Sequence, residues 1–319
     1  MAVRSSVWLP TAPCTPEACV ERPAVTVGPG RQLLRALGCA AVLITGVALI
    51  PPVRGLPPRV RAALIRAWAR LVLGSLGVRV RVRSADGSAA GRGRGGPGGG
   101  ALLVANHVSW LDILLIAALR PARMMAKTEV RRWPLLGPLA AWGGTLFIDR
   151  DRLRALPGTV AELAGALRRG ERVAVFPEGS TWCGRAGGRF RPALFQAALD
   201  AGVPVQPMAL RYRLGGLSTT AAAFVGEDGL LFSLRRVLAA DGLVAEVVLP
   251  APLPSGQYTG RRELARAAQA AVDRYRDGAE RTAQRVPAQR APAQPGPDGP
   301  AAHPAPPAHP PRPDRRLAC

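Results

Sequence analysis

Two stretches of different hydrophobic pattern stand near the start of the chain. Residues 1–30 hold scattered Pro, Thr and Cys without periodicity, which predicts a disordered leader. Leu33–Ile50 is apolar and is followed by Pro51-Pro52, but its length is marginal for a bilayer-spanning helix, which needs roughly 20 residues. Val60–Val78 mixes arginines with apolar residues, a pattern typical of a helix on an anionic membrane surface and equally of an amphipathic helix packed on a domain. We expect residues 31–77 to form membrane-associated helices.

Apolar strand candidates alternate with helix candidates through the rest of the chain. The strands are expected at 78–82, 101–105, 145–148, 172–176 and 205–212, and the helices at 109–119, 160–169, 192–201 and 261–276. Strands separated by helices predict an α/β fold, a largely parallel mixed sheet covered by helices on both faces. We expect one catalytic domain over residues 78–285. The Pro/Ala-rich tail, residues 286–319, is predicted to be disordered.

The charge balance is strongly basic. The 43 Lys and Arg residues against 21 Asp and Glu residues give a formal charge of +22, which attracts a polyanion or an anionic membrane surface. Aromatic residues make up only 5% of the chain and no recognition-helix pattern is visible, so we expect no nucleic-acid partner. If Leu33–Ile50 spans a bilayer, the arginines that follow it place the catalytic portion on the cytoplasmic face of the cell membrane.

The cysteines do not form a recognisable spacing pattern. All five are scattered, without a CxxC pair or a neighbouring histidine: Cys14, Cys19, Cys39, Cys183 and Cys319. The spacing therefore indicates neither a disulfide framework nor a zinc site, and we expect no metal and a reducing compartment. Cys183 is interpreted as a bystander thiol.

Histidine chemistry depends on a single residue. The chain has three histidines, and His303 and His309 lie in the Pro-rich tail, which leaves His107. Asp112 follows five positions later, and on one continuous helix the two side chains would diverge by roughly 140°. His107 must therefore precede a helix whose first turn contains Asp112, so that the carboxylate can orient the imidazole as a general base. The alternative is a capping box, with Ser109 as N-cap and Asp112 at N3, which needs no catalysis.

Two further segments offer groups for an anionic ligand. Phe176-Pro177-Glu178-Gly179-Ser180-Thr181 follows a strand, and its Gly-Ser-Thr run can supply backbone N–H groups and hydroxyls, although Pro and Gly can equally serve a simple turn. Gly144–Arg150 ends a strand with an arginine, which can grip a phosphate or be an ordinary surface charge.

Taken together, these segments resemble the glycerolipid acyltransferase family, whose bacterial prototype is 1-acyl-glycerol-3-phosphate acyltransferase. The match consists of an NHxSxxD block at Asn106–Asp112 (an HX4D motif), a GxxFIxR block at Gly144–Arg150, an FPEG block at Phe176–Gly179, and a V-P-V block at Val203–Val205. Common members continue the third block as FPEGTRS, whereas this chain has Ser180-Thr181-Trp182. No arginine follows the threonine directly, although Arg185, Arg189 and Arg191 come shortly after.

The resemblance implies a reaction and a set of roles. A fatty acyl group would pass from acyl-CoA or acyl-carrier protein to the hydroxyl of a lysophospholipid, without a further cofactor. His107 and Asp112 would be catalytic. The substrate-binding residues would be Arg150, Glu178, Gly179, Ser180 and Thr181. Glu178 would hold an arginine or accept a hydrogen bond from a glycerol hydroxyl, since a carboxylate repels phosphate.

Other functions account for less of the sequence. A serine hydrolase would need a GxSxG elbow, which the chain lacks. A non-catalytic membrane-binding protein would explain the charge and the apolar segment but not four blocks in order. Among acceptors, 1-acyl-glycerol-3-phosphate is expected first, with another lyso-lipid such as lyso-ornithine lipid as the alternative that the altered third block leaves open.

Overall fold

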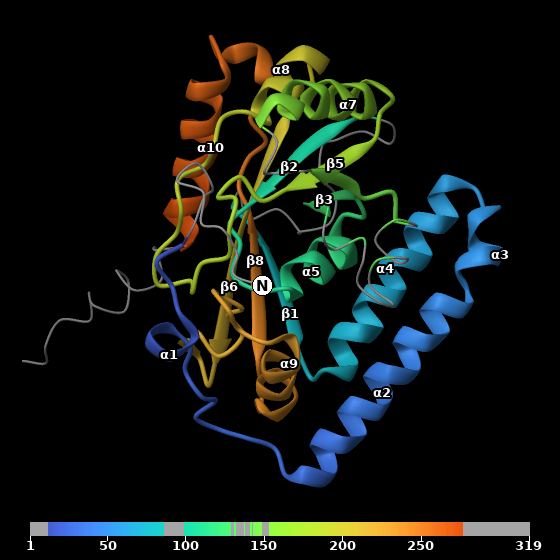
Figure 1. Ribbon diagram of the computed structural model, residues 1–319, viewed down its shortest axis with the longest axis vertical. Coiled ribbons are helices and arrows are strands. Elements are labelled where there is room, and N and C mark those ends of the chain that lie inside the picture. Colours follow the sequence, from blue (N-terminus) through green and yellow to red (C-terminus); the bar gives the residue numbers. More distant parts are fainter. Residues whose placement is uncertain are drawn as a thin grey trace, which may run out of the picture.

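A mixed β-sheet runs through the centre of the molecule, seen in a computed structural model of the chain (Figure 1). The structure describes residues 12–85, 99–128, 143–148 and 153–276, together with the single residues 131, 137 and 141. The central strands of the sheet are β2 (Ala101–Ala105), β5 (Arg172–Val175) and β6 (Val205–Leu214). The flanking strands are β1 (Arg79–Ser84), β3 (Arg123–Lys127), β4 (Leu146–Ile148), β7 (Leu217–Ser218) and β8 (Val244–Leu249).

The strand order is β1-β8-β6-β2-β5-β3-β4, with β7 paired to β6. All neighbours along this order are parallel except β6 and β8, which are antiparallel, as are β6 and β7. The expected α/β fold with a largely parallel mixed sheet is therefore confirmed. Because β2 and β5 are parallel neighbours, the segments that follow their carboxyl ends meet at one edge of the sheet, where ligands collect in such folds.

Helices cover both faces of the sheet and bury a separate apolar cluster on each. On one face lie α4 (Pro58–Ser75), α5 (Leu111–Leu119) and α9 (Leu230–Ala239); on the other lie α7 (Leu156–Arg168), α8 (Phe195–Ala201) and α10 (Arg261–Arg276). Strand β2 serves both clusters, because Leu102 and Val104 point to the α7 side and Leu103 points to the α5 side. Such double burial explains why the central strands are continuous apolar runs in the sequence.

The N-terminal segment differs from the expected disordered leader over the residues that the structure describes. Helix α1 (Pro16–Cys19) is capped by the Thr15 side chain, and Cys14 and Val27 are buried. The backbone of Val27 donates to Ala239, and Glu21 forms an ion pair with Arg185. The disorder prediction was wrong for residues 12–30 because contacts with distant parts of the chain, which no local pattern reveals, hold this segment. Residues 1–11 and the tail lie outside the described residues.

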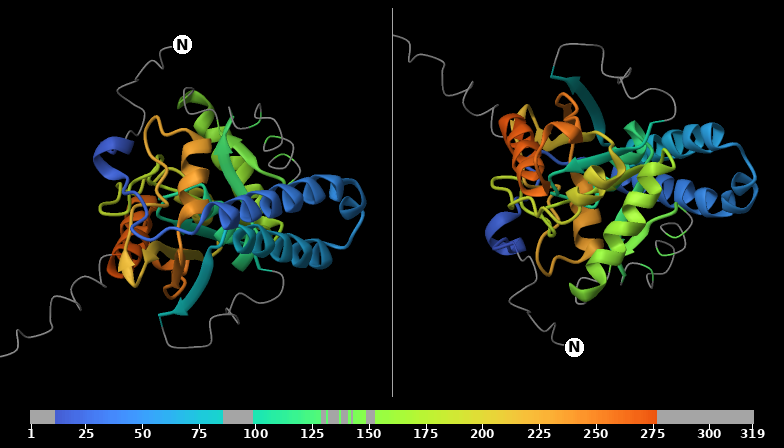
Figure 2. Two further views of the ribbon diagram at one scale, coloured as in Figure 1. Left: turned by 90° about the horizontal axis from the view of Figure 1, so that it is seen from below. Right: turned by 90° about the horizontal axis from the view of Figure 1, so that it is seen from above.

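A helical hairpin extends past the sheet on one side (Figure 2). It consists of α2 (Pro29–Ala48), the short α3 (Ile50–Arg54) and α4. Trp68 of α4 donates its indole N–H to the carbonyl of Val42, and a side chain at Gly46 would overlap the Trp68 ring, so α2 and α4 pack closely. Large apolar side chains on the outer surface of the hairpin are solvent-exposed: Leu33, Leu34, Leu37, Ile44, Leu64 and Leu71. Among the described helices, α2 alone has the length and composition to cross a membrane.

Candidate active site

His107 lies in the turn between β2 and α5, at the carboxyl edge of the sheet. Helix α5 begins at Leu111, so Asp112 is in its first turn and His107 precedes it, as the spacing predicts. The Nδ1 atom of His107 is 2.9 Å from Asp112 Oδ2. The imidazole is about one-fifth exposed and Asp112 is fully buried. The expected contact between the two side chains is confirmed.

Four donors converge on the Asp112 carboxylate. Oδ2 accepts the backbone N–H groups of Val108 and Ser109 at 2.7 and 2.8 Å, and Oδ1 accepts the Tyr212 hydroxyl at 2.6 Å. Because an ionised carboxylate only accepts hydrogen bonds, a neutral His107 must donate Nδ1–H to it, which leaves Nε2 with a lone pair. The expected capping box is not formed as predicted, because Trp110 is the N-cap of α5 and the Ser109 hydroxyl accepts the N–H of Leu111 instead of that of Asp112. The Asp112 carboxylate nevertheless accepts the Ser109 N–H while it contacts the histidine.

The Phe176–Arg191 segment holds His107 from the other side. The Phe176 ring stacks on the imidazole with the ring centroids 3.9 Å apart and the planes 10° from parallel. The His107 N–H donates to Glu178 Oε2 at 2.8 Å, and the His107 carbonyl accepts the Trp182 N–H at 2.8 Å. Ring, amide and carbonyl of His107 are thus all fixed by one loop, which leaves the imidazole little freedom to rotate.

Glu178 links two backbone segments by hydrogen bonds, a role that we call a brace. Its side chain is 3% exposed, with Oε2 on His107 and Oε1 accepting the Gly188 N–H at 3.0 Å. Burial raises its pKa to about 7, against the two N–H donors and the nearby Arg276, which lower it. The expected contact with a glycerol hydroxyl is not favoured by this geometry, because both oxygens already face backbone donors. One part of the expectation fits, since Arg276 lies close enough to act on the carboxylate.

Of the other residues expected to bind substrate, only some lie where a ligand could reach them. Gly179 adopts φ +79°, and its N–H donates to the Phe176 carbonyl, which makes it part of a turn instead of a free anion donor. Ser180 lines a cavity, whereas Thr181 is not among the residues lining it. Arg150 lies outside the described residues.

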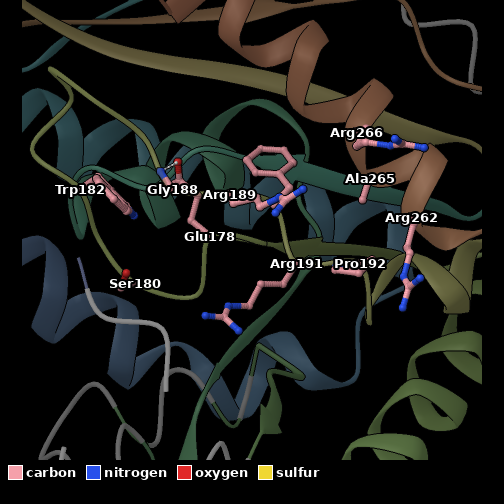
Figure 3. A pocket seen from close by; sticks show the side chains of 11 residues that line it. Glu178, Ser180, Trp182, Gly188, Arg189, Arg191, Pro192, Arg262, Ala265 and Arg266 are labelled. Atoms are coloured by element: carbon pink, nitrogen blue, oxygen red, sulfur yellow. Dashed lines mark hydrogen bonds between the residues drawn. The ribbon is translucent and has the colours of Figure 1, made fainter. Parts of the chain in front are cut away.

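That cavity has a volume of about 690 Å³ and opens beside the brace (Figure 3). Glu178, Ser180 and Trp182 form one side. Four arginines surround it, Arg189 and Arg191 from the loop and Arg262 and Arg266 from α10. Since the Glu178 oxygens are held by backbone N–H groups, the accessible charge of the lining is positive, and the cavity suits a phosphate or another anion. Arg185, the third arginine after the block, is instead paired with Glu21.

Comparison with known proteins identifies the family. A sequence model described as Acyltransferase matches residues 79–211. A lyso-ornithine lipid O-acyltransferase of Rhodobacter capsulatus is 33% identical over 79% of this chain and 92% of its own length. The chain belongs to the glycerolipid acyltransferase family.

Other family members cover a shorter part of the chain. A lyso-ornithine lipid O-acyltransferase of Pseudomonas aeruginosa is 46% identical over 54% of this chain and 66% of its own length. A 1-acyl-sn-glycerol-3-phosphate acyltransferase of Neisseria gonorrhoeae is 38% identical over 46% of this chain and 58% of its own length. The match thus spans less than two thirds of these two relatives. The crystal structure of the 1-acyl-sn-glycerophosphate acyltransferase PlsC from Thermotoga maritima has the same fold, with a TM-score of 0.61 at 18% identity over 78% of this chain and 95% of that one.

Several residues around this acyltransferase site were not singled out by sequence reasoning. Tyr212 binds Asp112 from the end of β6, and a tyrosine inside a buried strand is a signal that its hydroxyl needs a partner. Asn106, the first residue of the NHxSxxD block, had no role assigned from the sequence; its side chain pairs with both the N–H and the carbonyl of Leu210, which joins β2 to β6. Arg262 and Arg266 had no local signal, because only the fold brings α10 to the loop.

Proposed function

We propose that the protein transfers a fatty acyl group from a thioester, acyl-CoA or acyl-carrier protein, to the free hydroxyl of a lyso-lipid. The observation that carries this proposal is the orientation of His107. Its Nδ1–H is committed to Asp112, its ring is stacked on Phe176, and Nε2 keeps its lone pair. An imidazole held in this tautomer is prepared to accept a proton from a hydroxyl.

His107 would act twice in one turnover. Nε2 takes the proton of the acceptor hydroxyl as its oxygen attacks the thioester carbonyl, and the C–S bond then breaks as the proton passes to the departing thiolate. Asp112 stabilises the imidazolium between the two steps, as the carboxylate does in serine-hydrolase triads. A positioned general base of this kind contributes roughly 10² to 10⁴ in rate. No acyl-enzyme is required, since the acceptor hydroxyl is itself the nucleophile.

The arginine-lined cavity supports a phosphate-bearing acceptor, 1-acyl-glycerol-3-phosphate, with phosphatidic acid as product. Arg189 and Arg191 take the place of the arginine that common family members carry directly after the FPEG-Thr segment, and Arg262 and Arg266 add charge from α10. Four guanidinium groups suit a dianionic phosphate better than a zwitterionic ornithine headgroup, which would also need an exposed carboxylate for its ammonium group.

Lyso-ornithine lipid is the second candidate acceptor. The observation that favours it is the 46% identity to the Pseudomonas aeruginosa lyso-ornithine lipid O-acyltransferase, against 38% to the Neisseria gonorrhoeae 1-acyl-sn-glycerol-3-phosphate acyltransferase.

The helical hairpin supports association with a membrane, which we place at the cytoplasmic face of the cell membrane. Its exposed leucines form an apolar surface, and Arg59, Arg61 and Arg70 are exposed on α4. Apolar side chains that enter the acyl region next to arginines that meet anionic headgroups hold a protein at the interface. A substrate with embedded acyl chains could then reach the site without being extracted into water.

The acceptor and the base can be tested together. Full-length protein in detergent is offered 1-acyl-glycerol-3-phosphate and lyso-ornithine lipid, each with acyl-CoA and with acyl-carrier protein, and product and free thiol are measured. We expect phosphatidic acid, and we expect His107→Ala to abolish its formation, while His303→Ala, a histidine of the tail, keeps wild-type activity. Retained activity in His107→Ala would end the general-base assignment.

The cavity is tested by separating the two Michaelis constants. Arg189→Gln and Arg191→Gln should raise the KM for 1-acyl-glycerol-3-phosphate and leave that for acyl-CoA unchanged, whereas the matched control Arg154→Gln, at an exposed position, should change neither. A rise in the acyl-CoA KM alone would instead place the donor phosphates in the cavity. Transfer to lyso-ornithine lipid but not to the phosphate acceptor would establish the second candidate.

A further inference from the structure

Three cysteines that are far apart in the sequence meet in space. The sulfur atoms of Cys14, Cys19 and Cys183 all lie within 4.8 Å of one another. Cys14 and Cys183 are buried and Cys19 is partly exposed. Cys14 precedes α1, Cys19 is the last residue of α1, and Cys183 lies in the Glu178–Arg191 loop. The expectation from spacing, which left Cys183 as a bystander and gave no reason for a metal, does not describe this arrangement.

The sulfur atoms are also supplied with backbone donors. The N–H groups of Arg185 and Ala186 donate to the Cys183 sulfur, and the Cys183 N–H donates to the Cys14 sulfur. Gly184, which lies between Cys183 and Arg185, has φ +92°, and this conformation allows the chain to turn tightly around the Cys183 sulfur. These backbone donors hold the Cys14 and Cys183 sulfur atoms in place beside each other.

We propose that Cys14, Cys19 and Cys183 form a binding site for a thiophilic divalent metal ion, zinc in the cell. A tetrahedral ion with metal–sulfur bonds of about 2.3 Å places its sulfur ligands about 3.8 Å apart, within the spread found here. A disulfide joins only two sulfurs, at about 2.05 Å, and would leave the third without a role. The fourth ligand is a water molecule on the partly exposed side of Cys19. Three thiolates and a divalent ion carry one negative charge, and Arg185, which pairs with Glu21, also lies close enough to Cys183 and Cys19 to interact with that charge.

The site would connect the N-terminal segment to the catalytic loop. Cys183 directly follows Trp182, whose N–H holds the His107 carbonyl. A metal ion that fixes Cys183 to Cys14 and Cys19 therefore fixes the loop that positions the imidazole. It also anchors the residues from which the helical hairpin departs.

Metal analysis of the intact protein tests this proposal directly. Full-length protein without an affinity tag is purified in detergent with a thiol reductant, dialysed against metal-free buffer, and its zinc content is measured by plasma mass spectrometry. We expect one zinc ion per chain. After exchange with cobalt, we expect thiolate-to-cobalt charge-transfer absorption and the visible bands of a tetrahedral ion. Protein whose cysteines are all free thiols and which neither retains zinc nor shows these bands with cobalt would overturn the proposal.

Substitutions assign the ligands. Cys14→Ser and Cys183→Ser should each lose the zinc, whereas Cys39→Ser, which alters a buried thiol of α2 outside the cluster, should keep it. If the first two variants do not fold, the cobalt spectrum of the wild-type protein still decides, and a chelator should raise hydrogen exchange in residues 12–28 and 178–191 but not in α7. Intact mass showing the loss of two hydrogens, with a Cys14–Cys183 or Cys19–Cys183 cross-linked peptide, would replace the metal site by a disulfide.

Discussion

Replacing Glu178 with Gln distinguishes two roles for this residue: a hydrogen-bonding brace within the protein, and a direct ligand of the substrate. The ionised carboxylate accepts the N–H groups of both His107 and Gly188, whereas an amide can accept one and must turn its NH₂ group toward the other. Loss of one hydrogen bond to a charged group is worth about 1.5–3 kcal/mol. If most of this is expressed in the position of His107, kcat/KM falls roughly ten- to hundred-fold at pH 8. Glu162→Gln, at an exposed position of α7, is the matched control and should behave as wild type.

The effect of the Glu178→Gln substitution on activity should depend on pH. With a pKa of about 7, Glu178 is mostly ionised at pH 8 and mostly protonated at pH 6. The protonated acid offers one donor and one acceptor, as glutamine does. The ratio of wild-type to Glu178→Gln activity should therefore be large at pH 8 and approach one near pH 6. A ratio that does not change with pH would show that the ionised Glu178 carboxylate does not hold the His107 N–H. A rise in the acceptor KM with unchanged kcat would show that Glu178 contacts the substrate.

The raised pKa of Glu178 should also make the free energy of unfolding depend on pH. Its pKa is raised from 4.5 to about 7 in the folded protein, so folding favours the protonated form. The stabilisation is fully present below pH 4.5 and is lost as the pH rises through 7, a difference of about 3 kcal/mol. Between pH 4.5 and 8, denaturant unfolding should show a larger fall in the free energy of unfolding for wild type than for Glu178→Gln. Parallel curves would mean that burial does not perturb this group.

Three further substitutions probe the base, its support and the membrane surface. Asp112→Asn should lower kcat by about 10² or more with little change in KM, because the amide no longer fixes the Nδ1–H tautomer; a wild-type pH–rate profile would contradict this role. Tyr212→Phe should lower the free energy of unfolding by about 1–2 kcal/mol in urea titrations and kcat only several-fold, since Asp112 keeps its three N–H donors. The double change Leu34→Glu and Leu37→Glu should weaken vesicle flotation roughly a hundred-fold or more but spare activity in detergent, whereas Leu217→Glu, equally exposed on β7, should leave flotation intact.

Local sequence patterns predicted the His107–Asp112 contact and the central strands correctly. The five-residue interval between His107 and Asp112 is compatible with mutual contact only across a helix start, and the structure has that geometry. Continuous apolar runs gave strands β2, β5 and β6 nearly to the residue. The unassigned elements had weaker local signals. Strand β3 lacks branched apolar residues, and β8 has Glu246 at its centre, which the fold compensates with Arg211 across the ladder at 2.7 Å.

Contacts between residues far apart in the sequence could not be predicted from local patterns. Nothing around Cys14 indicates that Cys183 lies beside it, because contacts between distant segments depend on the complete packing of the chain. The same holds for Arg262 and Arg266, which an ordinary amphipathic helix would present to solvent. Glu178 was assigned to the substrate because its burial, and hence its backbone partners, could not be read from neighbouring residues.

The attachment of the helical hairpin at both ends has a topological consequence. At its start, Arg35 donates to the carbonyls of Leu238 and Ala240, and at its end α4 packs on α5, so both ends are fixed to the same body. Although α2, at about 30 Å, is long enough to cross a bilayer, a single crossing by α2 without a return through α4 would separate these ends. We therefore expect both ends of the hairpin to stay on the same side of the membrane. A reporter fused to the amino terminus should share its compartment with the catalytic body and be degraded by a protease added to that side alone.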